Sequence, residues 1–424
     1  MSDNAITHDA RVQVVGFGAA ALGVPLAADR RTQLSMLLEA GIVFIDAHPS
    51  LEAIARNRFP FHIESNSPGQ DFLHAISPRH AFADVLSSAA AVSIRRHSHG
   101  PVPLRDVGAL LNELSRSIVA KCSQHTRSGV LVGRDVATIQ VTGDGRFISH
   151  DRWRRPIARS SRLVLATGGL ETPSDESDLA PYRQRGIPAS DVLSGRADVH
   201  ETLLGGRRPL VIVGSAHSAF ACALYLLRMY PSSFDRGGIE IWCREVHLHY
   251  RSPAEAKREG YAHGLEAVCT SSQEVHRFSG LRGTAKGLYQ RATRGEEGRV
   301  RLCRADPHAL CRRLAGTDVF VLAAGFRTRT IPIYAPSGRE IVLARSGNFV
   351  RVDERCRLLD ANGKVVPGAL GLGLGYARAR GVDRYVGVNF FHGSDADAVL
   401  EQVLAPCTQG AIREVVAQSE EGTP

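Results

Sequence analysis

Long apolar runs that end in glycines and small residues recur along the chain. The first, at residues 12–15, passes through Gly16 and Gly18 into a small-residue helix that continues to about residue 28. The next run, at residues 41–45, ends at Asp46. Strands buried on both faces of a parallel sheet read as continuous apolar runs rather than alternating ones. The pattern therefore predicts an α/β fold that opens with a strand, a glycine turn and a helix.

The same arrangement returns about 200 residues later. An apolar run at residues 209–213 enters a turn at Gly214, a helix is expected over 219–230, and a further strand over 239–244. Two more apolar runs, at 162–166 and 319–324, finish on Gly168 and Gly325. We expect each of them to close one half of the molecule, because glycine lets the chain pass close to a bound ligand.

Short strands separate the two halves. We predict a meander near residues 130–132, 136–141 and 146–149, with a hairpin turn at 143–145. A glycine-rich strand follows at 366–375, with a helix over 396–404. The predicted domains are residues 1–205, a nested domain at 206–327, and a return to the first domain at 328–424.

Composition narrows the function classes. The chain has 424 residues, 43% hydrophobic and 22% charged, which excludes wholesale disorder and a coiled coil. No apolar run reaches the roughly 18–20 residues needed to span a bilayer, so we expect a cytoplasmic protein without a membrane anchor. The net charge of +9 lies in short basic groups without interleaved aromatic residues, which disfavours nucleic acid as a partner. The 8 cysteines lack zinc-ligand spacing and C-x-x-C pairs, so we expect neither a metal site nor cysteines close enough for disulfide exchange.

The first turn has the G-x-G-x-x-[GA] spacing of a dinucleotide site. Gly16 permits the tight turn, Gly18 lets a pyrophosphate approach the backbone, and Ala21 lets the helix pack closely on the strand. The pyrophosphate would lie at the positive end of the helix. Asp46 is placed to bind a ribose hydroxyl. The alternative is an ordinary turn between a strand and a helix.

The second turn departs from the pattern at one position. Gly214 and Ser218 keep it, whereas Ala216 replaces the middle glycine and should move a pyrophosphate slightly outward. Arg244 stands at the end of the following strand, where the first copy has an acid. A guanidinium pairs with a 2′-phosphate and an acid repels it, so this residue favours NADPH over NADH. A solvated surface arginine is the alternative.

Together these motifs resemble the flavoproteins that have two dinucleotide-binding domains. The resemblance implies an α/β fold of two Rossmann-like domains, an FAD domain with a β-meander and a nested NAD(P)H domain. By this likeness Gly16, Gly18, Ala21 and Asp46 would hold FAD, and the backbone of Val136 would contact the adenine. Gly214, Ser218 and Arg244 would hold NADPH. The C-terminal glycine strand would return to cover the flavin.

Among these flavoproteins the chain is most similar to flavin-dependent monooxygenases, including those that hydroxylate amines. The resemblance implies that NADPH reduces FAD, that molecular oxygen adds to give a peroxyflavin, and that oxygen passes to a neutral amine of a small nitrogen-containing metabolite. One alternative is an NAD(P)H-dependent flavin reductase that supplies a protein or quinone. Another is a non-catalytic nucleotide-binding homologue. A homo-oligomer is left open.

The remaining candidates lie on loops around the expected flavin. Ser65 and Asn66 could contact flavin carbonyls or form an ordinary turn. Asn389 and His392 precede the last predicted helix and are expected near the reacting oxygen, a core histidine being the alternative. The glycines where the chain crosses close to a nucleotide are Gly168, Gly325 and Gly375.

Overall fold

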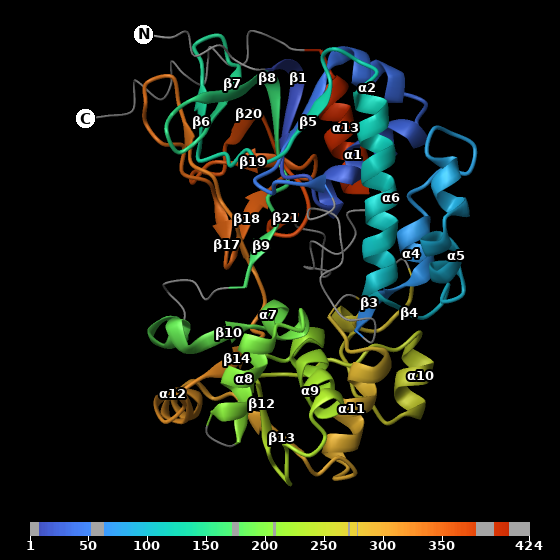
Figure 1. Ribbon diagram of the computed structural model, residues 1–424, viewed down its shortest axis with the longest axis vertical. Coiled ribbons are helices and arrows are strands. Elements are labelled where there is room, and N and C mark those ends of the chain that lie inside the picture. Colours follow the sequence, from blue (N-terminus) through green and yellow to red (C-terminus); the bar gives the residue numbers. More distant parts are fainter. Residues whose placement is uncertain are drawn as a thin grey trace.

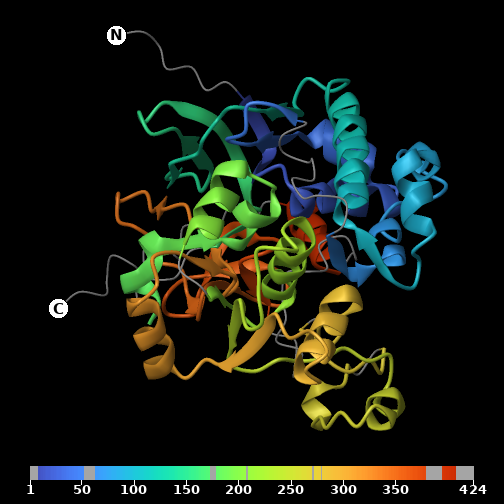
Figure 2. The same cartoon turned by 60° about the horizontal axis from the view of Figure 1, so that its bottom comes forward.

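The protein consists of two α/β bodies, one above the other in Figure 1 and seen from another side in Figure 2. The computed structural model describes residues 8–51, 63–171, 178–206, 209–269, 272–277, 279–378 and 394–406. Asn389 and His392 therefore lie outside the described residues. In the described part of the chain, no helix is long and apolar enough to cross a membrane.

The core of the first sheet is parallel. Strand β1 (His8–Val15) pairs with β2 (Ile42–Ile45) on one side and with β8 (Pro156–Leu165) on the other. Strand β5 (Gly129–Leu131) extends the sheet beyond β2, and β20 (Val365–Gly371) joins β8. All four pairings are parallel.

Strand β5 corrects the predicted meander. The sequence pattern places residues 130–132 in the meander, but β5 pairs in parallel with β2. The reason is the long helix α6 (Leu104–Cys122), which precedes β5 and provides the crossover that parallel strands require. The observed meander consists of β6 (Thr138–Val141), β7 (Phe147–His150) and the first half of β8.

Helices cover the first sheet. Helix α1 (Ala19–Arg30) packs against α13 (Ser394–Leu404) and α6 in one apolar core. Ion pairing supports this packing, since Arg30 lies 3.2 Å from Asp397. The C-terminal helix therefore lies on the same body as the N-terminal strand. The smaller helices of this body are α2 (Leu34–Ala40), α4 (Gly69–Leu73) and α5 (Ala89–Arg95).

The second sheet has five parallel strands. Their order is β10 (Gly186–Pro188), β14 (Phe320–Leu322), β11 (Leu210–Val213), β12 (Ile239–Cys243) and β13 (Val300–Arg304). Strand β10 begins before residue 206, where we expected the nested domain to start. A three-residue strand of Gly-Ile-Pro has too few apolar positions for the sequence pattern to show it.

Alternate residues of the second sheet face opposite cores. Ile212 and Ile241 pack with helix α9 (His217–Met229), whereas Val213 and Phe320 pack with α12 (Pro307–Ala315). Helix α11 (Gly283–Thr293) lies beside α9 on the same face, as Figure 1 shows. The other helices of this body are α7 (Ala189–Leu193), α8 (Ala197–Gly205) and α10 (Pro253–Arg258).

The chain crosses between the bodies along a short ribbon. Strands β9 (Gly169–Leu170) and β15 (Arg327–Thr328) pair antiparallel there. Beyond it, the returning chain forms β16 (Ile333–Tyr334), β17 (Arg345–Ser346), β18 (Phe349–Val352), β19 (Arg357–Leu359) and β21 (Tyr376–Arg378).

Candidate cofactor sites and the cavity between α9 and α11

The first glycine turn has the backbone that the sequence predicts. Gly16 has φ +103°, and a Cβ there would lie 2.3 Å from the carbonyl oxygen of Ala166. Gly18 precedes α1, and a Cβ built on it meets nothing within 4 Å. No side chain caps α1, and its first turn carries no acid. The helix terminus is thus open to an anion, while Ala21 is fully buried in the core.

Asp46 is engaged with the backbone of this turn. Its Oδ2 accepts a hydrogen bond from the Phe17 amide at 2.7 Å, and its Oδ1 accepts one from the His48 amide at 2.8 Å. The carboxylate therefore holds the turn in shape. A ribose hydroxyl would have to share oxygens that already accept from the backbone, so the predicted ribose contact stays a prediction.

The second turn shares two features with the first. Gly214 has φ +155°, and a Cβ there would lie 2.3 Å from the carbonyl oxygen of Ala323. Ala216 takes the place of Gly18 directly before α9, which again has neither a side-chain cap nor an acid in its first turn. Ser218 is partly buried in that first turn. Both turns thus present an uncapped helix terminus at the carboxyl end of a parallel sheet.

Arg244 has an unforeseen neighbour. It is exposed just after β12 and forms no hydrogen bond or ion pair with a described residue. In the register of β12 and β13, Cys243 lies opposite Arg304, whose side chain is also exposed and without a described partner. Two guanidiniums therefore stand at the edge where we expected one. The sequence signal for this second arginine is that strand β13 also ends in arginine, at Arg304.

The crossing glycines divide into two kinds. Gly168 and Gly325 have φ values of +72° and +94°, and a Cβ on either would meet nothing within 4 Å. Gly375 has φ +104°, but a Cβ there would lie 3.0 Å from Thr328. Gly375 is therefore packed against another part of the protein, and the Thr328 hydroxyl also donates a hydrogen bond to the Gly375 carbonyl.

Ser65 and Val136, two site candidates on the first body, contribute to its packing and hydrogen bonding. The Ser65 hydroxyl donates to the Ser67 carbonyl at 2.6 Å and accepts from the Val102 amide at 3.0 Å, joining β3 (Glu64–Pro68) to β4 (Pro101–Pro103). Its one proton is used, so donation from this hydroxyl to a flavin carbonyl does not fit the structure. Val136 is buried in the core beneath the meander. The side chain of Asn66 lies outside the described residues.

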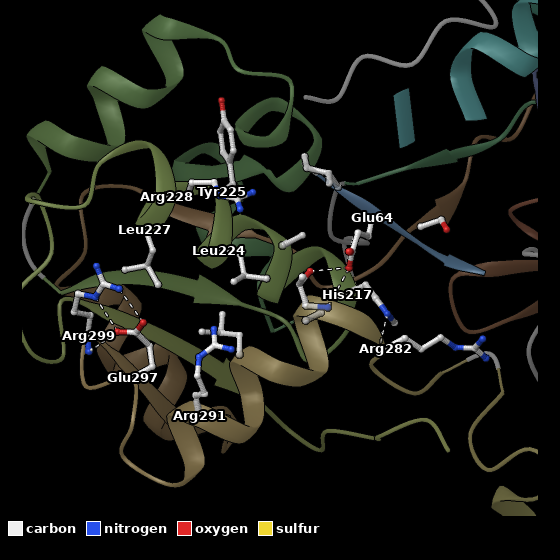
Figure 3. Close-up of a pocket in the computed structure, with 16 residues that line it drawn as sticks. Glu64, His217, Leu224, Tyr225, Leu227, Arg228, Arg282, Arg291, Glu297 and Arg299 are labelled. Atoms are coloured by element: carbon white, nitrogen blue, oxygen red, sulfur yellow. Dashed lines mark hydrogen bonds and ion pairs between the residues drawn. The ribbon is translucent and has the colours of Figure 1, made fainter. Parts of the chain in front are cut away.

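A cavity of about 420 Å³ lies between α9 and α11 and opens beside β3 (Figure 3). Leu224, Leu227 and Leu288 form part of its apolar lining. Polar groups stand at both ends: Glu64, His217 and Arg282 near β3, and Arg228 and Arg291 at the far end. Among the predicted site residues that the structure describes, Ser65 lines this cavity.

At the β3 end, one carboxylate joins the two bodies. Glu64 Oε2 accepts hydrogen bonds from the Thr284 amide at 3.1 Å and the Thr284 hydroxyl at 2.8 Å. Thr284 lies in the first turn of α11, so Glu64 caps this helix from the other body. No local pattern could predict a contact between residues 220 positions apart.

His217 is held as a neutral imidazole at the same end. Its Nε2 accepts a hydrogen bond from the Arg282 amide at 3.0 Å. Burial, reinforced by the charge of Arg282, lowers its pKa to about 4. A neutral imidazole that accepts at Nε2 carries its proton on Nδ1. This nitrogen has no partner in the described part of the chain, so it can donate to a ligand.

Behind His217 lies a second polar group. His249 Nε2 donates to Glu274 at 2.9 Å, and Arg282 lies 3.9 Å from the same carboxylate. Burial opposes ionisation of Glu274, but these partners outweigh it and lower its pKa to about 2. Arg282 Nε is buried and has no partner among the described residues.

Cys243 and Cys303 are near each other in the second sheet, and the prediction that no two cysteines are close enough for disulfide exchange stays a prediction. They lie on adjacent strands, with Cys243 Sγ 3.7 Å from the Cys303 carbonyl oxygen. Sequence spacing missed them because 60 residues separate them. Burial raises the pKa of both thiols, so they lack the thiolate character of a reactive pair.

A comparison with known protein families finds none that matches this chain. One curated relative, the CMP-5′-(3-aminopropyl)phosphonate hydroxylase of Streptomyces rubellomurinus, is 28% identical over 371 residues, which cover 80% of this chain and 82% of the relative.

Solved structures match nearly the whole chain. The cadaverine monooxygenase of Erwinia amylovora, solved with FAD, has a TM-score of 0.56 at 13% identity and covers 94% of this chain and 96% of its own. The ornithine N-hydroxylase of Kutzneria sp. 744, solved with reduced FAD, NADP⁺ and L-ornithine, has a TM-score of 0.52 at 15% identity and covers 97% and 100%. The bacillithiol disulfide reductase of Staphylococcus aureus has a TM-score of 0.53 at 12% identity and covers 94% and 99%.

At these identities the matches show the fold. The two parallel sheets, the two glycine turns and the nested order of the strands agree with it. The prediction of two Rossmann-like domains is confirmed, and the chain has the fold of the flavoproteins that bind FAD and a nicotinamide dinucleotide.

Proposed function

We propose that this protein is an FAD-dependent monooxygenase that uses NADPH and molecular oxygen to hydroxylate the nitrogen of a small amine linked to a phosphate or phosphonate. The observation that carries the proposal is the pair of matching turns at Gly16 and Gly214, each with its open helix terminus. The hydroxylase from Streptomyces rubellomurinus and the amine hydroxylases of the same fold support the choice of reaction.

The residues at each turn fit the cofactor proposed for it. FAD would lie with its pyrophosphate at Gly18, where the space beside the backbone is open, and would supply the chemistry that joins NADPH oxidation to oxygen transfer. NADPH would lie at Gly214 and Ser218. Arg244 and Arg304 would pair with its 2′-phosphate, which explains two exposed guanidiniums without protein partners.

The overall reaction balances with one amine and one dinucleotide. The amine, NADPH, a proton and oxygen give the hydroxylamine, NADP⁺ and water. The amine nitrogen must be neutral to form its bond to oxygen, so the protein must bind it without its extra proton. Shielding the site from water has two effects. It favours the neutral amine, and it protects the reduced cofactor from wasteful oxidation.

One experiment tests this proposal. The purified protein should carry a yellow flavin that anaerobic NADPH bleaches at lower concentration than NADH. In air, 3-aminopropylphosphonate or its CMP conjugate should stimulate oxygen uptake and yield a product heavier by one oxygen atom. Cadaverine and ornithine serve as comparison amines. A protein that cannot be loaded with FAD would refute the proposal.

A flavin reductase is the second candidate, because a disulfide reductase matches the fold as well as the hydroxylases do. The same assay separates the two. NADPH oxidation with dyes or quinones, without any oxygenated amine, would favour the reductase.

A further inference from the structure

Two short segments carry the chain between the bodies, and both meet the C-terminal glycine strand. The outgoing segment, residues 167–168, lies between β8 and β9, and the returning segment, residues 328–329, lies at the end of β15. The β9–β15 ribbon beside them has two residue pairs. Even a longer isolated pair of strands is only marginally stable. Contacts outside the ribbon must therefore hold the two crossing segments in place.

A hydroxyl group ties each crossing segment to the glycine strand. The Thr328 hydroxyl donates to the Gly375 carbonyl. The Tyr376 hydroxyl lies 2.9 Å from the Thr167 hydroxyl, and Figure 1 shows β9 and β21 side by side at this point. Thr167 has one hydroxyl proton and donates it to the Arg329 carbonyl at 2.6 Å, so Tyr376 is the donor to Thr167. Both segments are thus fastened to two successive residues, 375 and 376.

Tyr376 is enclosed by protein. Its exposed fraction is 2%, and its ring lies so close to Gly371 that a Cβ there would overlap it. Burial raises the pKa of the phenol, so the hydroxyl keeps the proton that it donates. A side chain enclosed in this way has no surface for a cofactor. Tyr376 can therefore act on a bound cofactor only through Thr167.

The crossing segments run beside open space. Gly168 follows Thr167 and has φ +72°, and a Cβ on it would meet nothing within 4 Å. A shift of Thr167 would move this crossing relative to the glycine strand. Transfer of a hydride from NADPH to FAD, which with a proton gives NADP⁺ and reduced FAD, needs the two rings at a defined distance. A misplacement of about 1 Å can lower the rate of such a step about a hundredfold.

We propose that Tyr376 is a positioning residue, which holds both crossing segments through Thr167 so that the nicotinamide bound to one body meets the flavin bound to the other. This inference rests on the proposed function and names the side chains that set the approach of its two cofactors. Loss of the phenol hydroxyl should slow the step that needs both cofactors. It should leave the binding of each cofactor intact, because the buried phenol touches neither.

Stopped-flow reduction of the FAD-loaded protein by NADPH without oxygen tests the role. Tyr376→Phe keeps the packed ring and removes the donor. The limiting rate of flavin reduction at saturating NADPH should fall at least fivefold, while the Kd values of FAD and NADP⁺ change less than twofold. Thr167→Val breaks both hydrogen bonds and should lower the rate at least as much. Thr167→Ser keeps the hydroxyl and should stay within twofold of wild type.

The matched control is Tyr182→Phe. It removes a phenol hydroxyl that donates to the Cys311 carbonyl at 3.2 Å within the second body, away from the crossing segments. This variant should change the limiting rate of flavin reduction less than twofold.

Hydrogen exchange of FAD-free protein gives a readout that needs no reaction. The Arg329 amide donates to the Gly168 carbonyl at 3.2 Å and so joins the two crossing segments. Its exchange reports local opening of this contact. In Tyr376→Phe it should be at least threefold faster than in wild type, whereas Tyr182→Phe should leave it unchanged.

An unchanged limiting rate or an unchanged exchange of the Arg329 amide in Tyr376→Phe would overturn the role. Equal slowing in Tyr182→Phe would do so too, by showing a general effect of losing a phenol. Weaker FAD binding in Tyr376→Phe would place the effect at the flavin site and not in the approach of the cofactors. Failure of the proposed function is seen separately: wild-type protein that takes up no FAD would refute that function, while hydrogen exchange would still show whether Tyr376 holds the crossing.

Discussion

At the level of single residues, the two turns depend on the backbone rather than on side chains. Gly16 and Gly214 face the same obstacle, a carbonyl oxygen 2.3 Å from any Cβ, and both have positive φ. Only glycine adopts this geometry without strain. Gly18 and Ala216 occupy equivalent places before a helix, where φ is −88° and −108°, values that any residue adopts. The first glycine of each motif is thus required for the backbone of the turn, whereas the second position leaves room for the ligand.

Gly18→Val should separate these roles. The side chain enters open space, so the melting temperature of FAD-free protein should stay within a few degrees of wild type, while FAD binding is lost because the methyl groups occupy the place of the pyrophosphate. Gly16→Ala should instead destabilise the protein by about 1–3 kcal/mol. Absorbance at the flavin band and thermal melting check both variants. A yellow Gly18→Val protein would contradict the assignment of this turn.

Arg244→Ala and Arg304→Ala should each raise the KM for NADPH, by about tenfold, because a charge-assisted hydrogen bond contributes roughly 1.5–3 kcal/mol when both partners remain. The KM for NADH should hardly change, since NADH lacks the 2′-phosphate. Steady-state kinetics with both dinucleotides make the comparison, and Arg312→Ala is the matched surface control. Equal losses for both dinucleotides would remove the two arginines from the 2′-phosphate site.

His217 should make the protein sensitive to acid. Its pKa of about 4 in the folded protein lies below the usual 6.5, so the unfolded chain binds more protons between these values. Its contribution to stability is complete above about pH 6.5 and is lost as the pH falls toward 4. At pH 5 the loss is about 1–2 kcal/mol.

His217→Gln tests this, because the amide can accept from the Arg282 amide and does not titrate. Denaturant unfolding at pH 7 and pH 5 should show a smaller loss of stability in the variant than in wild type. The same loss in both proteins would assign the acid sensitivity to other histidines.

At the level of elements, the sequence could predict the helices and strands that local periodicity determines. Helix α6 was predictable because its apolar positions are helically spaced, and strand β11 because its apolar run is continuous. The runs that predict strands β1 and β12 are apolar apart from one polar residue each, Gln13 and Glu240, and each runs toward a turn. Strand β10 is too short to show such a pattern, and the partner of β5 is decided by the helix before it. The engaged hydroxyl of Ser65 depends on Val102, 37 residues away. Contacts of this kind are set by packing and leave no local signal.

The cap that Glu64 provides to α11 is such a contact and can be tested. Glu64→Ala leaves the amide and hydroxyl of Thr284 without their acceptor and should cost about 1 kcal/mol of stability. Glu64→Gln keeps an acceptor oxygen and should cost less. Chemical denaturation measures both. Glu113→Ala, which breaks an exposed pair with Arg116, is the control and should change stability by no more than about 0.5 kcal/mol. An equal effect of the Glu64 and Glu113 variants would show that the cap contributes nothing.

At the level of the whole molecule, two bodies with separate cores share few connections. Each sheet has its own pair of apolar clusters, one on each face. Among the described residues, the links between them include the β9–β15 ribbon, the Glu64 cap, and Ile63 and Leu104, which pack against the core of the second body. Because one proposed cofactor lies on each body, each ligand should stabilise mainly the body that holds it.

Scanning calorimetry of FAD-stripped protein should therefore show two transitions that respond to different ligands. FAD at 100 times its Kd adds about 2.7 kcal/mol to the body that binds it, and NADP⁺ does the same for the other. For bodies of this size the upward shift is about 5–10 °C. In Gly18→Val the response to FAD should vanish while that to NADP⁺ remains. If instead one transition moves as a whole with either ligand, the contacts between the bodies couple them into a single folding unit, and Glu64→Ala should then be the variant that divides it.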